Sequence, residues 1–343
     1  HMKALFLEDV GKLALRDIEK PVPKADELLI RIEACGICGT DRHLFLGEFP
    51  SKPPVTPGHE FVGVIEAVGR DVTDFEPGMR VTGDPNIACG HCAECQRGRV
   101  NLCANLQAIG IHRNGGFADY AVLPHKQAHL LPSSLNPLHG AFCEPLACCL
   151  HGVDLAKLKA GSSAIVIGGG VIGLLVVQLA RLAGATDVVL ITRNVEKRQL
   201  SEKLGATATL DPSSGGDVVE QITGSSGLLP GGADVVFECA GLRQTVEQAP
   251  LLARRGGMAV ILGVLPQGEK AEIEPFDLLF REVALVTSFL NPFTHRRAAE
   301  LIASGMIVVE PLISRTIGLE EAVGVISNPA IAGEIRTLVV PQH

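Results

Sequence analysis

The sequence is poor in aromatic residues and has no concentration of positive charge. It contains no Trp and a single Tyr among 343 residues, its formal net charge is −8, and no dense run of Lys or Arg occurs. Proteins that bind a phosphate backbone depend on clustered cations for their affinity. The composition therefore argues against a nucleic acid as partner.

Signals for export or membrane insertion are also absent. No charged start is followed by an apolar stretch and a small-residue cleavage site, so we expect a cytoplasmic protein with no membrane partner. The apolar residues 164–180 lie at the lower length limit of a membrane span, and their glycine cluster favours a strand, a turn and a helix instead. The ten cysteines show no framework of spaced pairs, which argues against a disulfide-rich secreted domain.

The chain is longer than a single hydrophobic core usually supports, so two domains are expected. Hydrophobic residues make up 46% of the sequence, which is enough for two packed cores. Short strand patterns broken by Pro and Gly occupy the first part of the chain and predict a β-rich, partly open barrel. These strands are predicted at residues 3–8, 12–18, 26–38, 61–69, 80–84 and 117–124.

From about Ser163 the pattern changes to strands that alternate with helical stretches, which is typical of βαβ units and a parallel sheet. Six strand candidates are enough for one complete doubly wound, dinucleotide-binding domain. They are residues 163–167, 187–192, 206–210, 233–240, 258–264 and 283–289. After Pro292, a helix at 293–305 and strands at 311–317 and 334–341 are predicted to return to the first domain.

Four cysteines between residues 89 and 103 form the strongest local signal in the chain. Their spacing lets four thiolates converge tetrahedrally on one zinc ion, whereas the alternatives are a disulfide pair or free thiols. A closed four-sulfur site has no open coordination position, so it predicts a structural zinc rather than a catalytic one. The ligands are Cys89, Cys92, Cys95 and Cys103, and His91 is a possible competitor inside the same segment.

A glycine turn lies between the first strand of the βαβ region and the helix that follows. Gly168, Gly170 and Gly173 form G-x-G-x-x-G, which permits a tight turn and a close approach of the backbone to a pyrophosphate at the helix N-terminus. An ordinary glycine-rich turn is the alternative. The position and the flanking elements favour dinucleotide binding.

The second strand of this region ends without the acidic residue that usually holds the ribose of NAD. The neighbourhood instead carries Thr192, Arg193, Lys197 and Arg198. Cations at this point favour a cofactor with a 2′-phosphate, so NADP is preferred to NAD. Alternatively, these cations form a solvated helix start and the selectivity is relaxed.

A second metal site is predicted from residues that are far apart in the sequence. Cys38, His59, Glu60 and Glu144 supply sulfur, imidazole and carboxylate, the mixed ligand set of a catalytic zinc that keeps an open position. Taken singly, each of these residues is as readily explained by packing or by an ordinary hydrogen bond.

The motifs CGICGTD, PGHEFVGVI, the four-cysteine segment, CEPLACCLHG and the glycine turn occur in the order and spacing of a known family. The chain resembles the zinc-dependent medium-chain dehydrogenase/reductase family, and within it the threonine/sorbitol (polyol) dehydrogenase-like branch. The resemblance covers essentially the whole chain. It implies an α/β fold, with a GroES-like β-rich catalytic domain at 1–152 and 290–343 that carries both zinc sites, and a six-stranded Rossmann domain at 153–289.

The resemblance also implies roles for single residues. Cys38 and His59 would bind the catalytic zinc, and Glu60 and Glu144 would complete its shell or alternate in it. Cys143 is taken as a packing residue whose side chain points away if the segment is extended. Thr40 and His43 match the proton relay of the family. Cofactor contacts are further expected at Ile172, Leu262 and Val264.

The implied activity is hydride transfer between NAD(P) and a secondary alcohol, a polyol or an amino-alcohol such as threonine, by a homo-oligomer. Phe289 stands where polyol enzymes of the family carry a polar residue, which counts against a sugar alcohol. The other histidines, His295 among them, are expected to be loop or packing residues. Two alternative functions remain: a zinc-free quinone or enoyl reductase on the same fold, and a cofactor-binding module without catalysis.

Overall fold

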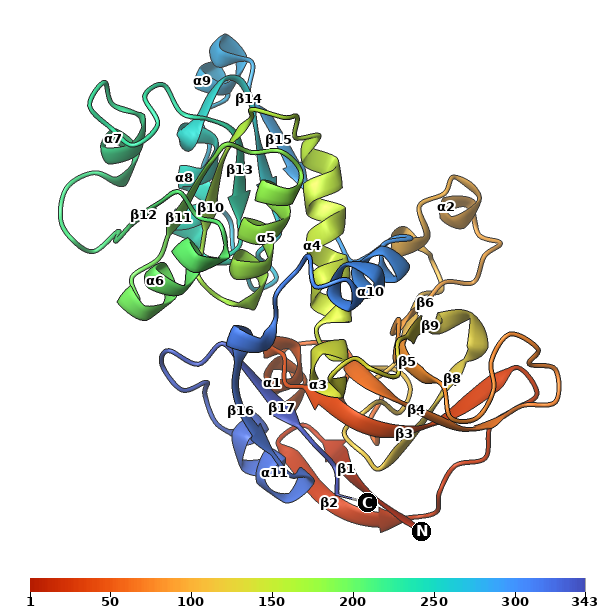
Figure 1. The fold of residues 1–343 in the computed structure, drawn as a ribbon. Helices are drawn as coiled ribbons and strands as arrows, with labels where there is room; N and C mark the ends of the chain where they lie inside the picture. Colours follow the sequence, from red (N-terminus) through yellow and green to blue (C-terminus); the bar gives the residue numbers. More distant parts are fainter. Residues whose placement is uncertain (343) are drawn as a thin grey trace. The chain divides into compact units, whose positions relative to one another are not determined.

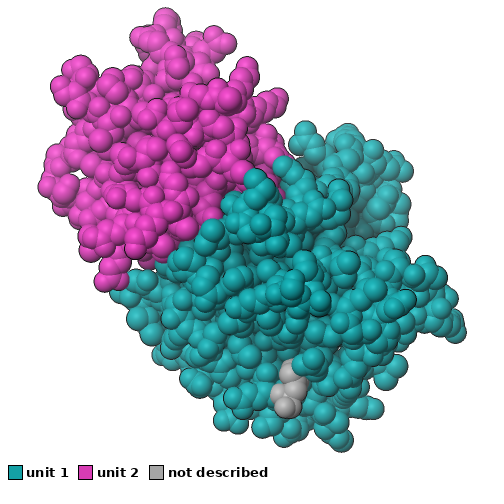
Figure 2. Space-filling view, viewed as in Figure 1, with its two compact units in different colours: residues 1–147, 291–343 teal, residues 148–290 magenta. Residues whose placement is uncertain are grey.

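The computed structural model describes residues 1–342, and the chain divides into two compact units (Figure 2). Unit 1 combines residues 1–147 with the chain from Asn291 onward, and unit 2 comprises Cys148–Leu290. The first boundary falls inside helix α4 (Cys143–Ala156). All ten cysteines are free thiols. Within residues 1–342, no helix combines the length and the apolar character needed to cross a membrane.

Unit 2 is built on a six-stranded parallel sheet with the strand order β12-β11-β10-β13-β14-β15 (Figure 1). The six predicted strands and the predicted doubly wound sheet are confirmed. The order reverses next to β10, which is the switch point where ligands bind in such sheets. The strands are β10 (Ser163–Ile167), β11 (Asp187–Ile191), β12 (Ala208–Leu210), β13 (Ala233–Glu238), β14 (Ala253–Ile261) and β15 (Ala284–Thr287).

The helices of unit 2 follow the strands as βαβ crossovers. Strand β10 reads SAIVI and is buried over four of its five residues, as expected for a central parallel strand that is covered on both faces. The helices are α5 (Val171–Leu182), α6 (Val195–Leu204), α7 (Val218–Thr223), α8 (Arg243–Leu252) and α9 (Pro275–Arg281).

Unit 1 is dominated by a seven-stranded sheet with the path β16-β17-β3-β4-β5-β9, in which β8 also pairs with β3. The two C-terminal strands join the N-terminal part of the chain because β17 pairs antiparallel with β3, with Leu338 opposite Gly36. The strands are β3 (Glu27–Gly36), β4 (Glu60–Val68), β5 (Arg80–Gly83), β8 (Tyr120–Pro124), β9 (Ala128–Leu131), β16 (Ile313–Ile317) and β17 (Arg336–Val339). Two further pairs are β1 (Met2–Asp9) with β2 (Lys12–Ile18), and β6 (Asn86–Ile87) with β7 (Gln107–Ala108).

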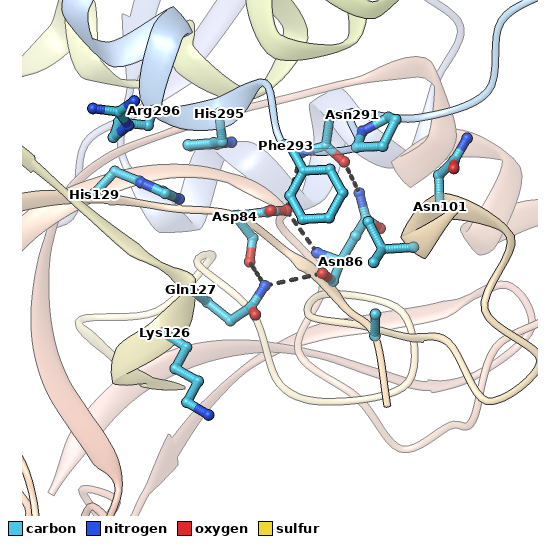
Figure 3. Close-up of a pocket in the computed structure, with 13 residues that line it drawn as sticks. Asp84, Asn86, Asn101, Lys126, Gln127, His129, Asn291, Phe293, His295 and Arg296 are labelled. Carbon is cyan, nitrogen blue, oxygen red and sulfur yellow. Dashed lines mark hydrogen bonds between the residues drawn. The ribbon is translucent and has the colours of Figure 1, made fainter. Parts of the chain in front are cut away.

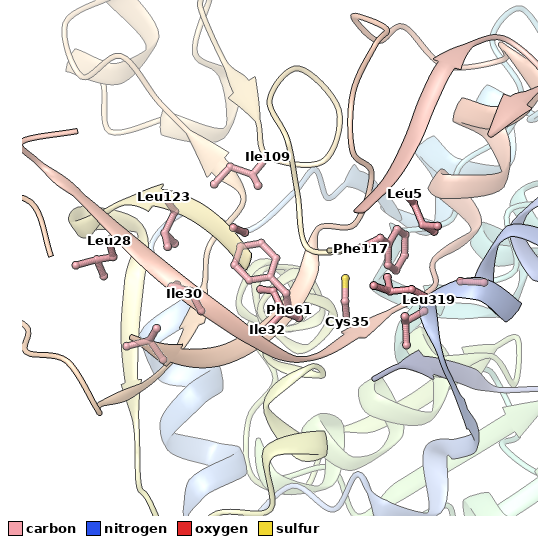
Figure 4. Packing of buried hydrophobic residues seen from close by; sticks show 14 of the residues in the cluster. Leu5, Leu28, Ile30, Ile32, Cys35, Phe61, Ile109, Phe117, Leu123 and Leu319 are labelled. Atoms are coloured by element: carbon pink, nitrogen blue, oxygen red, sulfur yellow. The ribbon is translucent and has the colours of Figure 1, made fainter. Parts of the chain in front are cut away.

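The hydrophobic core of unit 1 packs against one face of this sheet (Figure 4). Phe61 and Phe117 are fully buried there beside aliphatic residues of β3, such as Ile30 and Ile32. Gly83 on β5 allows this packing, since a Cβ at that position would meet the Phe61 ring at 2.5 Å. Odd and even positions of β4 therefore face different environments, and Glu60 and Val62 lie on the face opposite to Phe61.

Most helices of unit 1 were not predicted. They include α1 (Gly39–Leu46), α3 (Pro137–Gly140), α10 (His295–Ala303) and α11 (Leu319–Ser327), of which only α10 was predicted. Helix α3 packs on β3 and β4 and α10 packs on β9, whereas α11 contributes Leu319, Ala322 and Ile326 to the core cluster around Phe61. The segment around Cys143 is helical, so the argument from an extended backbone at this cysteine was wrong. A Cβ at Gly140 of α3 would meet Val62 at 2.5 Å, which shows how closely this helix approaches β4.

Candidate functional site

The four cysteines of the first predicted site come together in the loop between β6 and β7. The sulfurs of Cys89, Cys92, Cys95 and Cys103 lie within 4.8 Å of one another, and His91 is not part of the group. The short helix α2 (Ala93–Gln96) begins right after Cys92 and carries Cys95. Backbone N–H groups also point at the sulfurs: Cys92 donates to Cys89 Sγ and Cys89 donates to Cys103 Sγ, each at 3.3 Å.

The charge state of this cluster matches the requirements of a cation. Hydrogen bonds from the backbone at His91 and from the side chain of Asn105 lower the pKa of Cys89 to about 5. Loss of hydration and the neighbouring sulfurs of Cys92 and Cys103 raise the pKa of Cys95 to about 12. The sulfurs thus compete for negative charge, and a divalent cation between them would allow all four to be thiolates.

The second cluster consists of Cys38, His59 and Glu60, whose ligand atoms also lie within 4.8 Å of one another. Cys38 precedes helix α1, and Asp41 fixes the turn because its Oδ2 accepts a hydrogen bond from the Cys38 N–H at 2.9 Å. Glu60 is the first residue of β4 and lies opposite Gly36. A Cβ on Gly36 would meet Glu60 Oε1 at 2.5 Å. The glycine therefore makes room for the carboxylate.

Arg336 is a part of this site that the sequence did not reveal. Its side chain is buried, lies 3.2 Å from both carboxylate oxygens of Glu60 and donates to the Ile37 carbonyl at 2.9 Å. Burial alone would lower the pKa of Arg336, but the charges of Glu60 and of nearby acidic groups raise it. The guanidinium compensates a carboxylate that would otherwise be buried without a partner.

His59 lies between acidic groups. Its Nδ1 is 3.7 Å from Asp41 Oδ1, and its Nε2 is 3.9 Å from Glu60 Oε2. Burial would lower the pKa of His59, yet the acidic groups of Asp41, Cys38 and Glu144 raise it well above its usual value. Both His59 Nδ1 and Asp41 Oδ1 are buried without a hydrogen-bond partner.

The donors of this second cluster fit a zinc ion. Sulfur, imidazole and carboxylate converge, unpartnered polar atoms surround them, and excess negative charge remains for a cation to compensate. Glu144 is buried in the first turn of α4 and acts electrostatically on His59, but its oxygens are outside the group of atoms within 4.8 Å. Its neighbour Cys143 is fully buried, and burial raises its pKa to about 12.

The two residues of the predicted relay lie on helix α1. The Thr40 Oγ1 is 3.8 Å from Cys38 Sγ, so the hydroxyl lies beside the candidate metal ligand. His43 is three residues later on the same helix face, is more than half exposed, and its Nδ1 pairs with Glu48 Oε2 at 2.6 Å. The helix thus places one hydroxyl at the cluster and one imidazole in solvent.

In unit 2 the glycine turn has the conformation that its sequence predicts. Gly168 adopts φ 110°, and a Cβ on Gly173 would lie 1.8 Å from the Gly168 carbonyl oxygen. Gly170 begins helix α5, and no atom lies within 4 Å of where its Cβ would stand. Open space in front of the helix N-terminus is what an anionic group needs. Ile172 lies in the first turn of the same helix.

The cations after β11 are not equivalent. Arg198 Nη1 donates to the carbonyl oxygens of Thr192 and Arg193 at 2.9 and 2.7 Å, so this guanidinium braces the turn. Burial lowers the pKa of Lys197, which lies at the start of α6, and the structure gives it no acidic partner. Arg193 is exposed. Two cations, Lys197 and Arg193, therefore remain available to an anion.

Glu238 holds the loops at the carboxyl end of the sheet, and no motif in the sequence pointed to this residue. Its buried Oε1 accepts from the N–H groups of Ala240 and Gly241 at 2.8 and 2.7 Å. A Cβ on Gly263 would lie 2.4 Å from Glu238 Oε2. The absence of a side chain at Gly263 therefore lets the segment with Leu262 and Val264 lie close to this carboxylate. Leu262 packs on Gly152, and Val264 is 82% exposed.

Comparison with known families matches both units. The family "Alcohol dehydrogenase GroES-like domain" matches residues 24–133, and the family "Zinc-binding dehydrogenase" matches residues 171–304. These ranges contain the four-cysteine cluster, the Cys38 cluster and the glycine positions from Gly173 onward.

Individual proteins are similar over almost the whole chain. A crystal structure described as a zinc-binding dehydrogenase from Sinorhizobium meliloti 1021 bound to NADP is 64% identical, covers 99% of both chains and has a TM-score of 0.98. D-arabinitol dehydrogenase 1 of Uromyces fabae is 32% identical over 93% of this chain and 91% of its own. L-threonine 3-dehydrogenase of Bacillus subtilis is 33% identical over 93% of each chain.

Proposed function

The chain belongs to the zinc-dependent alcohol dehydrogenase family, and we propose that it interconverts a secondary alcohol or polyol with its carbonyl compound, preferring NADP and holding two zinc ions. The single observation that carries this proposal is the Cys38, His59 and Glu60 cluster in unit 1. The glycine turn of unit 2 supports it by supplying a place for the cofactor pyrophosphate.

We assign the catalytic zinc to Cys38 and His59, with Glu60 or Glu144 completing the shell, and the structural zinc to Cys89, Cys92, Cys95 and Cys103. Zinc bound at Cys38 and His59 would supply a Lewis acid for the alcohol oxygen, and nicotinamide would supply the hydride acceptor. Arg336 pairs with both carboxylate oxygens of Glu60, so this carboxylate lies at the cluster with its charge compensated.

The chain's own residues provide the route for the proton of the alcohol. Thr40 is too weak a base to keep a proton, but its hydroxyl can pass one along a hydrogen-bonded chain. His43 is suited to exchange this proton with water because it is exposed and hydrogen-bonded to Glu48. The cysteine cluster and the metal ligands argue against the zinc-free quinone or enoyl reductase, which would need neither.

The preference for NADP rests on the charge around the end of β11. The turn after β11 carries Thr192 and Arg193 in place of an acidic residue, and Lys197 and Arg193 can bind a 2′-phosphate. Arg198 positions them by bracing the turn. A charge-assisted contact with phosphate is stronger than a neutral hydrogen bond, so these cations favour the phosphorylated cofactor.

A homo-oligomer is part of the proposal, with β15 as the contact strand. This strand ends the sheet of unit 2 and is largely exposed. Next to it, α9 exposes Phe276, Leu279 and Phe280 by 64 to 75% of their surfaces. Open edges and apolar patches of this kind pair with a second copy in many proteins. A cytoplasmic location is also proposed, because clusters of free thiolates persist in a reducing compartment.

The test combines metal analysis with turnover of a panel of alcohols with NADP and with NAD. We expect two zinc ions per chain in the intact protein, and one in Cys38→Ser and in Cys92→Ser. Cys38→Ser should lose turnover with an unchanged melting temperature. Cys92→Ser should lower the melting temperature because the structural site contributes folding energy. Full turnover in a Cys38→Ser protein that holds one zinc would refute the assignment.

A further inference from the structure

The polar groups that line the pocket at the end of β5 in unit 1 are hydrogen-bonded to one another (Figure 3). The pocket has a volume of about 440 Å³, and none of its lining residues belongs to a metal cluster. Asn291 Nδ2 donates to Asp84 Oδ1 at 3.0 Å, and Asn86 Nδ2 donates to Asn291 Oδ1 at 2.8 Å. The carboxylate of Glu238 in unit 2 is different, because it is fully buried and one of its oxygens has no hydrogen-bond partner.

The carboxylate of Glu238 is held in place, but its charge is not paired. Its Oε1 accepts from the N–H groups of Ala240 and Gly241 at 2.8 and 2.7 Å, and Thr245 Oγ1 lies 2.9 Å from the same oxygen. Its Oε2 has no hydrogen-bond partner, and within residues 1–342 Glu238 forms no ion pair. Backbone and hydroxyl donors carry no net charge. Glu238 therefore leaves one negative charge inside unit 2.

This charge acts on the groups around it. Burial, Cys149 and Glu238 together raise the pKa of the neighbouring Cys239 thiol well above its usual value. A second negative charge beside Glu238 is therefore disfavoured, and by the same Coulomb interaction a positive charge nearby is favoured.

Glu238 lies at the edge of the sheet where the parallel strands end. In the strand register it is the neighbour of Ile167 on β10 and of Ile261 on β14. The glycine turn follows Ile167, and the segment with Leu262 and Val264 follows Ile261. Neighbouring strands are about 4.8 Å apart. The carboxylate thus lies at the switch point of the sheet, between the two segments at which cofactor contacts are expected.

The order of the strands indicates which half of a dinucleotide lies near Glu238. A doubly wound sheet binds one mononucleotide on each side of the switch point. The cations Arg193 and Lys197, which follow β11, assign the 2′-phosphate and its adenosine to the half made of β10, β11 and β12. The nicotinamide mononucleotide is then left for the half made of β13, β14 and β15, which contains Glu238.

Glycine backbone separates the Glu238 carboxylate from the surface of these segments. Gly263 is partly exposed, and a Cβ on it would lie 2.4 Å from Glu238 Oε2 and 2.3 Å from the Gly241 nitrogen. A Cβ on Gly241 would meet the backbone of Val264 at 3.0 Å. The segments after β13 and β14 therefore lie against each other with no side chain between them. Across so thin a layer of protein, a buried charge acts on a ligand more strongly than it would through water.

We propose that the Glu238 carboxylate biases the cofactor site toward the oxidised dinucleotide, whose nicotinamide ring is a cation, and against the reduced one, whose ring is neutral. Hydride transfer to the ring removes its positive charge, so a fixed negative charge behind the ring stabilises the oxidised form more. This inference rests on the proposed binding of NADP in unit 2. It adds a determinant of redox state, which the glycine turn and the cations after β11 cannot provide because the phosphates are the same in both forms.

The experiment measures the Kd of NADP⁺ and of NADPH by isothermal titration calorimetry on the zinc-loaded protein, without alcohol. Glu238→Gln keeps an oxygen for the N–H groups of Ala240 and Gly241 and removes the charge. We expect the ratio of the Kd for NADPH to the Kd for NADP⁺ to fall roughly tenfold in this variant. Asp187→Asn removes one charge from the exposed first residue of β11 and is the matched control, which should keep the ratio.

A purely structural role of Glu238 would give a different pattern of binding constants. Glu238→Asp keeps the charge on a shorter side chain, so the loops should be held less well and both forms should bind more weakly by similar factors. An unchanged ratio in Glu238→Gln, or a ratio that falls equally in Glu238→Asp, overturns the proposal. If Glu238→Gln fails to fold, Thr245→Lys brings an ammonium group to the same carboxylate and should lower the ratio. An unchanged ratio in that variant then overturns the proposal.

These binding measurements do not depend on turnover. A ratio that falls in Glu238→Gln supports the inference even if no alcohol is oxidised, an outcome that would defeat only the proposed function. An unchanged ratio in a variant that still oxidises an alcohol overturns only the inference. The same titrations with NAD⁺ and NADH separate the preference for NADP from the bias toward the oxidised form. Failure of the intact protein to bind any of the four dinucleotides would overturn both the inference and the proposed function.

Discussion

At the scale of single residues, the candidate site combines compensated charges with buried polar atoms that a metal ion would satisfy. Arg336 compensates Glu60, while Asp41 and Glu144 act together on His59. His59 Nδ1 and Asp41 Oδ1 are nevertheless left without hydrogen-bond partners inside the protein. Such groups are rarely buried without a ligand or a catalytic reason.

A residue-scale prediction concerns Lys197. Of the cations near the end of β11, Arg198 is bonded to backbone carbonyls and Arg193 acts on Asp211, whereas Lys197 has no acidic partner among the described residues. Lys197→Met should raise the KM for NADP roughly tenfold and change the KM for NAD little, because only NADP has the 2′-phosphate. The measurement is initial-rate kinetics with both cofactors. Lys203→Met removes the same charge from an exposed position of α6 and is the control. Equal changes for NADP and NAD would contradict the assignment of Lys197.

At the scale of elements, the parts of the site that could be predicted are those made by neighbouring residues. The glycine turn and the four-cysteine cluster are contained in short segments, so spacing alone indicates their geometry. The contacts that were missed join distant segments: Arg336 and Glu60 are 276 residues apart, and His295 and Thr82 are 213 apart. These residues meet only because distant strands pair and α10 packs on the sheet. A pattern in a short stretch of sequence cannot predict such long-range contacts.

Helix α4 shows the same limit in another form. An extended backbone at Cys143 would turn its side chain away from the site, but the segment that begins there forms fourteen residues of helix. Its sequence, CEPLACCLHGVDLA, has few polar residues, so the alternation of polar and apolar positions that marks a helix is weak. Packing in the folded protein, rather than a local pattern, therefore determines its conformation. The side-chain direction assigned to Cys143 followed from the wrong element, although its burial was expected.

An element-scale prediction concerns Asp84, which follows β5. Burial, opposed by hydrogen bonds from Asn291 and the Asn86 backbone, raises the pKa of Asp84 from 3.8 to about 6. Between these values the folded protein binds more protons than the unfolded chain, so this group makes stability fall as pH rises, and its penalty is complete above about pH 6. The rise corresponds to roughly 3 kcal/mol at most.

Asp84→Asn keeps an oxygen for both donors and removes the charge. We expect the variant to melt higher than the intact protein at pH 8, by an amount that shrinks to nothing near pH 4, in calorimetric scans across that range. Asp71→Asn alters an exposed carboxyl of unit 1 and should produce a much smaller difference. A melting difference for Asp84→Asn that is the same at all pH values would exclude a buried carboxylate as its cause.

At the scale of the whole molecule, the exposed edge of the sheet in unit 2 is the surface best suited to contact between copies. Strand β15 presents unpaired backbone groups, and edge strands of soluble proteins are usually blocked by charge, Pro or a second chain. The residues of β15 are Ala, Leu, Val and Thr, without any of these devices. Beside it, Phe276 and Phe280 of α9 stack at 4.2 Å on an exposed face. A second copy pairing edge to edge would satisfy both features at once.

The corresponding prediction is that charge on this edge separates the copies. Leu285→Lys combined with Phe280→Glu should convert a dimer or tetramer into a smaller species in size-exclusion chromatography with light scattering, because buried unpaired charges oppose association. Leu228→Lys, another exposed apolar residue of unit 2, should leave the mass unchanged. Since every ligand of the two metal clusters lies in unit 1, zinc content should stay the same in all variants. An unaltered mass in the double variant would place the contact between copies on another surface, and loss of zinc would mean that the substitutions damage the fold instead.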